Sequence, residues 1–440
     1  MRIRRFTATN VHGYLDLDVS FNRDLTLLTG INGSGKTTVV RGMVALLTPS
    51  FSALAGTEFE SMTVEIDHDD ERRSIRATRT ENDITLSIDK LEQPITVAIF
   101  KKAEYEIPSR FTEREKEYYR EVHTTEGKNP TLRFLSELPT PMFLDLERRT
   151  QGLVRKRVYV SPTELDRQYS ATASHGEGLL QATGLAEEAY QSFLTKQSKL
   201  QSDLRNQLVV TAFETLTQQS GFHLPDSWER ANLEYQRDLV IQTLEAIKVS
   251  EAPVKKFYDE LLELLPTLVG KNINELVETE SGRARFSKWV SMQPQVKQID
   301  AIVKLITQYN ENITKARRPI ENFLASINRF LADSGKELQF NQNGRPVVYA
   351  GSHRIKTLAG LSSGERQLLV ILTHLAFNPQ GSKANVLIID EPELSLHIRW
   401  QEHFVSALQE AGRDVQLILA THSPSIILDR TDACVDVHAT

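Results

Sequence analysis

The sequence predicts an α/β fold, built on a mixed sheet with flanking helices and interrupted by a helical or short coiled-coil insertion. Three observations support this class. The stretch TGINGSGKTT, a glycine-rich loop, lies between an apolar run and a helical pattern near the N-terminus. Two apolar runs near the C-terminus each end in polar residues, as buried strands do. Between these parts, from about 161 to 333, apolar residues recur at helical spacing.

Length and composition limit the class of protein. A chain of 440 residues can hold two or three domains, and its net charge of −6 excludes a bulk binder of polyanions, although a local DNA-binding face stays open. The single cysteine, Cys434, excludes an intrachain disulfide and a cysteine zinc site, which suits a reducing cytosol. We find no secretory signal and no run of about 18 apolar residues, so we expect a cytoplasmic protein without a membrane span.

The glycine-rich loop fits the pattern G-x-x-x-x-G-K-[ST] at Gly30, Gly35, Lys36 and Thr37. LTLLT before it reads as a buried strand, and TTVVRGMVALL after Lys36 reads as a helix, which is the context of a phosphate-binding loop. The alternative is a chance glycine turn before a helix. The residues expected to contact phosphate are Asn32, Gly33, Ser34, Gly35, Lys36, Thr37 and Thr38.

Physical chemistry assigns roles within this loop. Glycines let the backbone curl so that N–H groups point at phosphate oxygens, and the helix N-terminus adds its positive end. We expect Lys36 to reach the β- and γ-phosphates and Thr37 to ligate Mg²⁺. The guanine-reading pattern N-K-x-D does not occur, which favours ATP over GTP.

The run NVLIIDEPE, residues 385–393, is an apolar strand that ends in adjacent carboxylates. Asp390 at the strand tip can hold Mg²⁺ through water, and Glu391 can polarise a water for attack on the γ-phosphate. The alternative is a buried strand capped by two solvated acids.

Two further motifs follow the same logic. Ser362, Ser363 and Gly364 begin a helical pattern over residues 358–377, where a helix N-terminus can bind an anion. A capping box with Glu365 is the plainer interpretation of these residues. His422 ends the apolar strand VQLILATHS and can hydrogen-bond a γ-phosphate or the attacking water, or it is simply a loop histidine.

In this order, the motifs resemble those of the ATP-binding-cassette ATPases, and in particular their RecF/SMC/OLD branch. The run from Glu391 to His397 looks like that branch's Walker B and D-loop, and LSSGERQ resembles its signature motif, with Ser363 where many transporters carry glycine. The opening RIRRFTATNVHGYLDLDVSF resembles its first hairpin, and Gln151 is a candidate Q-loop residue. The resemblance covers about residues 1–160 and 336–440.

The resemblance implies a Mg²⁺-dependent ATP hydrolase in which two subunits close head to tail across ATP. Ser363 and Gly364 of one chain would bind the γ-phosphate held by its partner, so a homodimer or an assembly of dimers is expected. It also implies three segments: a first ATPase lobe over 1–160, a helical insertion over 161–335, and a second lobe over 336–440.

The residues between the motifs support this division. Period-two alternation over residues 61–100 predicts an antiparallel meander. The insertion suggests a helical bundle or a short antiparallel coiled coil, and if it holds two helices of about 35 residues it would reach about 50 Å. Its apolar stripes either pack on each other or form a platform for a partner. A hairpin is expected at Asn343-Gly344. The basic run from Arg148 to Arg157 reads as solvated surface, or as a contact for phosphate or nucleic acid.

Three functions stay open. The first is a sensor or scaffold subunit of an anti-phage defence complex, because the chain looks like the OLD-like ATPase subunits of the PARIS and Septu systems. Only 18 residues follow His422, which leaves no room there for a Toprim nuclease, so a separate effector protein and a phage trigger protein are the expected partners. The second is a RecF-like repair ATPase that binds DNA, and the third is a scaffold held together by ATP.

Overall fold

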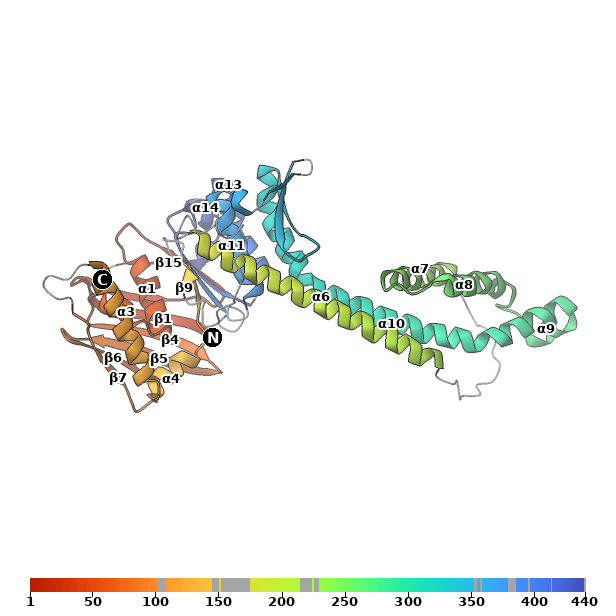
Figure 1. Cartoon of the computed structure of the whole chain (residues 1–440), viewed down its shortest axis with the longest axis horizontal. Helices are drawn as coiled ribbons and strands as arrows, with labels where there is room; N and C mark the ends of the chain where they lie inside the picture. Colours follow the sequence, from red (N-terminus) through yellow and green to blue (C-terminus); the bar gives the residue numbers. More distant parts are fainter. Residues whose placement is uncertain are drawn as a thin grey trace. The chain divides into compact units, whose positions relative to one another are not determined.

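A computed structural model of the chain describes residues 1–101, 108–144, 150–151, 175–213, 224, 229–351, 354–356, 358–378, 385–394, 396–412 and 414–438. They form two compact units, the first made of Met1–Ala189 with Asn322–Thr440 and the second of Tyr190–Glu321. The helices α6 (His175–Phe213) and α10 (Glu280–Leu331) contribute residues to both units (Figure 1). Among the described helices, none is long and apolar enough to cross a membrane.

An antiparallel sheet of the first unit has the strand order β2-β1-β4-β5-β6-β7. Its strands are β1 (Arg2–Val11), β2 (Leu15–Ser20), β4 (Ser61–His68), β5 (Glu71–Arg79), β6 (Asp83–Ile88) and β7 (Ile95–Ala98). In β2, buried apolar residues alternate with exposed polar ones, because one face of this sheet covers a core. The opening hairpin and the meander over residues 61–100 are both confirmed.

The second sheet of this unit is mixed, as the sequence predicts. Its order is β15-β3-β14-β13-β8-β9, with five parallel strands and β9 antiparallel at one edge. The strands are β3 (Leu25–Thr29), β8 (Met142–Leu144), β9 (Thr150–Gln151), β13 (Val386–Asp390), β14 (Gln416–Ala420) and β15 (Cys434–Asp436). Because β3, β14 and β13 are parallel neighbours, their carboxyl ends meet at one edge of the sheet.

Alternation along these parallel strands separates two cores. Leu28, Ile388 and Ile418 face the core that contains α1 and the antiparallel sheet. Their sequence neighbours Leu27 and Leu387 face the core that contains α11 and α13. Each fully buried leucine contributes roughly 1.5–3 kcal/mol, so the sheet is fixed from both faces.

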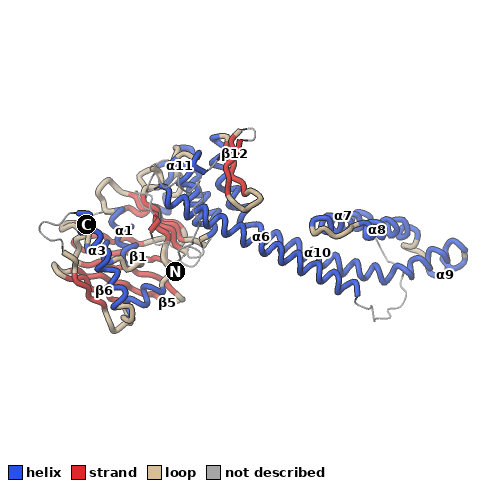
Figure 2. Tube along the Cα trace, viewed as in Figure 1, coloured by secondary structure: helices blue, strands red, loops and turns tan. Residues whose placement is uncertain are grey.

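The first unit contains further helices and a small third sheet besides these two sheets (Figure 2). The helices are α1 (Lys36–Leu47), α2 (Phe51–Ala55), α3 (Pro108–Thr125), α4 (Pro130–Glu137), α11 (Ser363–Phe377), α13 (Ile398–Ala411) and α14 (Pro424–Ile427), with 3-10 turns at Ala332–Ser334, Leu358–Gly360 and Thr431–Ala433. A small sheet is formed by β10 (Lys336–Phe340), β11 (Pro346–Ala350) and β12 (Arg354–Lys356). The turn between β10 and β11 contains Gly344, which confirms the expected hairpin.

The second unit is helical. Besides parts of α6 and α10 it contains α7 (Arg230–Ala246), α8 (Ala252–Leu264), a 3-10 turn (Leu265–Thr267) and α9 (Ile273–Glu278). Within the unit α6 and α10 run antiparallel, since Arg317 lies over the ring of Phe193 while Leu204 shares a buried cluster with Ile306. Helix α10 continues through two internal prolines. The apolar stripes seen in the sequence therefore pack on one another here.

Candidate functional site

The glycine-rich loop joins β3 to α1 at the carboxyl edge of the mixed sheet. Gly30, Gly33 and Gly35 have φ values of 137°, 85° and 100°, which side chains rarely adopt. A Cβ on Gly30 would lie 2.8 Å from the Ser34 hydroxyl oxygen and 2.8 Å from the carbonyl oxygen of Val437. The loop therefore keeps its curled shape only with glycine, and α1 begins directly after it.

Lys36 is folded across this loop. Its ammonium donates hydrogen bonds to the carbonyl oxygens of Gly30 at 3.0 Å and Ile31 at 3.1 Å, and the residue is 6% exposed. Burial lowers the pKa of Lys36, while the carboxylates of Asp390 and Glu391 oppose that shift. A cation held at the centre of the loop suits an anionic ligand.

Thr37 and Asp390 are brought together from sequence positions far apart. The Thr37 hydroxyl donates to a carboxylate oxygen of Asp390 at 3.4 Å, across the adjacent ends of β13 and α1. Asp390 is 3% exposed. Hydroxyl and carboxylate oxygens are ligands that Mg²⁺ prefers, so these two side chains fit the metal that the sequence predicts.

Glu391 follows β13 in the left-handed region, with φ of 50°. Its backbone N–H donates to the carbonyl oxygen of Ala420 at 2.9 Å, which fixes the turn against the end of β14. Left-handed backbone at a non-glycine residue costs about 1–2 kcal/mol and occurs preferentially at functional sites. Glu391 thus lies directly after the end of β13, one residue beyond Asp390.

The loop after β14 lies beside this turn. Thr421 is buried and donates its backbone N–H to the carbonyl oxygen of Leu28, whereas His422 is exposed. Glu393 accepts hydrogen bonds from both residues of this loop. Sequence reasoning did not single out Glu393, although its place two residues after Glu391 was a usable signal.

The signature segment forms the start of α11. Ser362 caps the helix and forms a capping box with Glu365, so the plain interpretation of this motif holds in the structure. Glu365 is 2% exposed and accepts from the ammonium of Lys336 at 2.7 Å and the hydroxyl of Ser334 at 2.6 Å. Burial raises the pKa of Glu365, but the hydrogen bonds from Lys336 and Ser334 hold it below its usual value.

Ser363 is exposed at the first turn of α11, and Gly364 is buried beside it. Within the described part of the chain, no hydrogen bond or ion pair joins these two residues to the glycine-rich loop. The capping box leaves the Ser363 hydroxyl accessible, so capping and anion binding do not exclude each other.

Gln151 lies on β9, where it pairs with Phe143 of β8, one strand away from β13. Its side chain lies outside the described residues. The same holds for almost all of the basic run from Arg148 to Arg157. The Q-loop assignment therefore stays a prediction.

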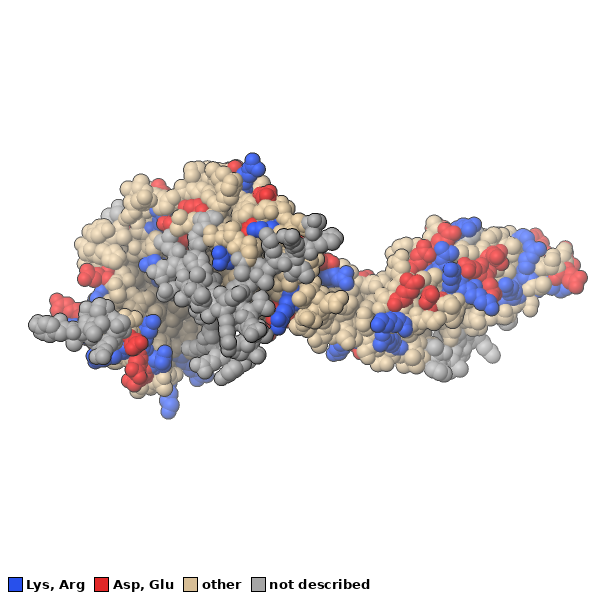
Figure 3. Space-filling view, turned by 45° about the horizontal axis from the view of Figure 1, so that its top comes forward, with Lys and Arg blue, Asp and Glu red and all other residues tan. Residues whose placement is uncertain are grey.

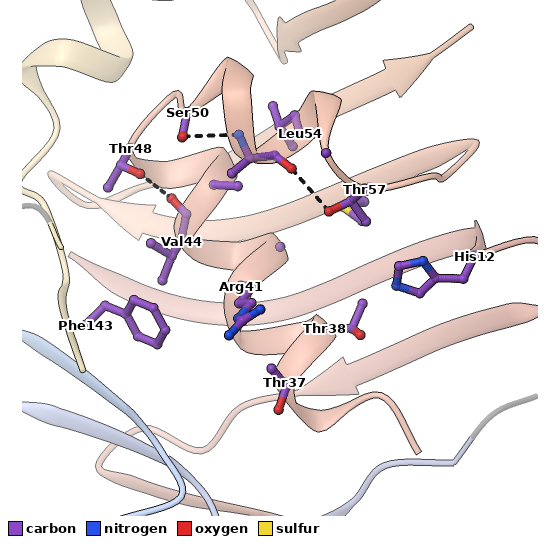
Figure 4. A pocket seen from close by; sticks show the side chains of 15 residues that line it. His12, Thr37, Thr38, Arg41, Val44, Thr48, Ser50, Leu54, Thr57 and Phe143 are labelled. Carbon is purple, nitrogen blue, oxygen red and sulfur yellow. Dashed lines mark hydrogen bonds between the residues drawn. The ribbon is translucent and has the colours of Figure 1, made fainter. Parts of the chain in front are cut away.

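A cavity of about 480 Å³ extends along α1 from Thr37 and Thr38 (Figure 4). Arg41 lines it from the next turn of α1, His12 from the β1–β2 hairpin, and Phe143 from β8. Arg41 was not among the residues predicted from the sequence, although it lies four residues after Thr37 and hence on the same face of the helix. The cavity leaves room for a ligand beside the first turn of α1.

Three features of this site define the P-loop class of nucleotide-binding proteins. They are a glycine-rich loop after a parallel strand, an aspartate at the end of another strand beside the threonine of that loop, and an acidic residue directly after the aspartate. The family model described as "AAA ATPase domain" matches residues 1–427. The chain therefore belongs to this family and is an ATP-binding ATPase.

Two curated relatives share part of the chain. The "Retron Vc95 probable ATPase" of Vibrio cholerae serotype O1 biovar El Tor is 30% identical over 121 residues, 27% of this chain and 23% of that protein. The "Retron Ec83 probable ATPase" of Escherichia coli is 31% identical over 75 residues, 15% of this chain and 14% of that protein. The matches thus span less than a quarter of those relatives.

Solved structures that resemble the chain include SMC head domains. The Smc head domain of Pyrococcus furiosus, with an extended coiled coil and bound to the C-terminal domain of ScpA, is 12% identical with a TM-score of 0.43, covering 100% of this chain and 94% of that chain. The SMC head domain from Thermotoga maritima is 9% identical with a TM-score of 0.37, covering 99% and 92%.

Proposed function

We propose that the chain binds ATP with Mg²⁺ at the carboxyl edge of the mixed sheet and hydrolyses it. The observation that carries this proposal is the contact of Thr37 with Asp390 directly beneath the glycine-rich loop. These oxygens would hold Mg²⁺, which neutralises charge on the β- and γ-phosphates when bound. Lys36 would then exchange its carbonyl partners for phosphate oxygens.

Hydrolysis is assigned to the two turns beyond β13 and β14. Glu391 would accept a proton from the attacking water through its carboxylate. Its backbone N–H, bonded to Ala420 at the end of the neighbouring strand, holds the turn that carries this side chain. His422 would hydrogen-bond the γ-phosphate or that water from the adjacent loop. Both roles require the strand ends to keep a fixed separation.

Replacing the base tests this assignment. Glu391→Gln should lower the turnover number about 100-fold or more, while ATP still binds, since general bases contribute that much. The exposed Glu402 on α13 offers a control, and Glu402→Gln should hydrolyse ATP at the wild-type rate. Wild-type turnover in Glu391→Gln would remove Glu391 from the mechanism.

We also propose that two chains close head to tail on ATP, so that Ser362, Ser363 and Gly364 bind the partner's γ-phosphate. The helix start provides an exposed hydroxyl at the positive end of α11. Apolar side chains exposed on the phosphate loop and after β13 fit burial by a second chain. These are Ile31 at 82%, Leu394 at 43% and Ile398 at 59% exposure.

For the biological role we propose a sensor or scaffold subunit of an anti-phage defence complex that controls a separate effector, a nuclease or a toxin. The OLD-like motif set and the partial similarity to retron ATPases support this role. We expect Glu391→Gln, expressed with its neighbouring genes and purified with Mg-ATP, to retain a stoichiometric effector protein. Nucleic acid without a protein partner would favour the repair function instead.

On the face of the second unit seen in Figure 3, surface charge does not favour the DNA-binding alternative. In the second unit, basic and acidic side chains are interspersed over the described residues on the face seen in Figure 3. Lys288 pairs with Glu260 at 3.2 Å and Arg237 with Asp259 at 3.8 Å. Binding that weakens steeply with salt would nevertheless reveal phosphate contacts.

A further inference from the structure

The carboxylate of Glu393 bridges to the loop that carries His422. One oxygen accepts the backbone N–H of His422 at 2.7 Å, and the other accepts the hydroxyl of Thr421 at 2.8 Å. Hydrogen bonds to an ionised acceptor are roughly twice as strong as neutral ones. The bridge therefore fixes the position of the His422 backbone relative to the turn after β13.

Gln401 makes a second bridge from the first turns of α13. Its amide nitrogen donates to the carbonyl oxygens of Leu396 at 2.9 Å and Glu393 at 3.4 Å. Its amide oxygen accepts the hydroxyl of Ser423 at 2.6 Å. The two bridges tie Glu393 and Leu396 to the loop formed by Thr421, His422 and Ser423, through side chains that no local pattern in the sequence pairs.

We propose that Glu393 is a positioning residue, supported by Gln401, that sets the distance between Glu391 and His422 for ATP hydrolysis. This inference rests on the proposed function. Each Glu393 oxygen accepts a hydrogen bond from the Thr421–His422 loop, so we assign the effect of the residue on the reaction to that loop. Glu391, two residues earlier, is left as the carboxylate available to the reaction.

If the Glu393 bridge is lost, the rate of turnover should change and the affinity for ATP should not. The phosphate loop would hold ATP through α1 and Lys36, whose ammonium donates its hydrogen bonds to Gly30 and Ile31 and not to Glu393. The Glu393 carboxylate contributes only the smallest of the electrostatic influences on Lys36. Displacing His422 by about 1 Å can cost about 100-fold in rate. Loss of the bridge should therefore lower kcat and leave the dissociation constant for ATP essentially unchanged.

Glu393→Ala removes both acceptors and is the main variant. We expect a loss in kcat of about 100-fold, unchanged ATP affinity, and faster hydrogen exchange of the His422 amide in the full chain. Glu393→Gln keeps one acceptor oxygen, so it should recover part of the lost rate and serves if the alanine variant does not fold. Glu402→Gln, on the exposed face of α13, is the matched control and should behave as wild type.

A second background tests whether Glu393 acts through His422. In a His422→Ala chain, adding Glu393→Ala should cause little further loss of kcat, because the group being positioned is gone. Equal losses in both backgrounds, or wild-type kcat in Glu393→Ala and Glu393→Gln, would overturn the inference and leave the ATPase proposal intact. A wild-type chain without turnover would instead overturn the proposed hydrolysis, and this inference with it.

Discussion

At the scale of single residues, Gly30 shows how closely the end of β3 is packed. A Cβ there would meet the Ser34 hydroxyl and the Val437 carbonyl at 2.8 Å each, at a φ of 137°. Gly33 also has positive φ, yet nothing lies within 4 Å of the position of its Cβ. Substitutions at these two glycines can therefore separate the cost of steric clash from the cost of backbone strain.

We predict that Gly30→Ala lowers the free energy of unfolding by clearly more than about 1 kcal/mol and abolishes ATP binding, because clash adds to strain. Gly33→Ala should cost less stability, because strain acts alone. Chemical denaturation without nucleotide measures the free energy of unfolding of both variants. Equal losses in the two variants would contradict the role of packing against Ser34 and Val437.

His374 is a buried residue with a pH-dependent consequence. It lies 1% exposed on α11, and its ring nitrogens have no hydrogen-bond partner within the described part of the chain. Burial lowers the pKa of His374 to about 4. The unfolded chain takes up this proton near pH 6.5, so stability is full above that pH and is lost as the pH falls towards 4.

We predict that His374 alone removes about 3 kcal/mol of stability between pH 6.5 and 4. His374→Leu keeps a similar volume and should flatten the dependence of the free energy of unfolding on pH in this range. The exposed His403 provides the comparison, and His403→Gln should retain the wild-type slope. A wild-type slope in His374→Leu would show that other groups govern acid sensitivity.

At the scale of elements, the signature helix is anchored by β10. Lys336 and Glu365 form an ion pair at 2.7 Å, with exposed fractions of 16% and 2%. The pair Arg329–Glu410, at 3.0 Å, is about half exposed at both ends. Buried pairs depend on both partners, while exposed pairs contribute little, so the two make a matched comparison.

We predict that Lys336→Met destabilises the chain by about 3 kcal/mol, because it leaves the Glu365 carboxylate buried without its cation. Arg329→Met should cost under about 1 kcal/mol. Adding Glu365→Gln to Lys336→Met should restore part of the loss. Urea denaturation measures all three, and equal costs for the two single variants would contradict the anchoring role.

The elements that could be predicted from sequence are those with a strong local pattern. The strands ending at Thr29, Asp390 and Ala420 are short apolar runs before polar residues, and the structure confirms each. The capping box at Ser362 was also readable, since its partners are three residues apart. Local spacing alone thus located most of the candidate site.

What sequence could not reveal depends on contacts between distant segments. Lys336 with Glu365, and Glu393 with the loop at His422, join residues about 29 apart through tertiary packing. Helix lengths could not be predicted either. The two helices of about 35 residues considered from the sequence compare with 39 residues in α6 and 52 in α10, which continues through Pro294 and Pro319.

At the scale of the whole molecule, the account requires two chains for one reaction. Ser363→Arg should abolish ATP hydrolysis without unfolding the chain, because a bulky cation would occupy the place of the partner's γ-phosphate while the exposed site tolerates it. Melting temperature and turnover, measured on one preparation, check this. Normal turnover would exclude Ser363 from the site.

The most direct test of this central claim mixes two inactive chains. Lys36→Ala removes the phosphate loop's cation and Ser363→Arg blocks the signature, so each variant alone should be inactive. In a head-to-tail dimer of one of each, one site combines both defects and the other has neither. Half of the randomly mixed dimers would have one intact site, so the account predicts recovery of about a quarter of wild-type turnover. No recovery in chains that demonstrably co-assemble would contradict a site shared between two subunits.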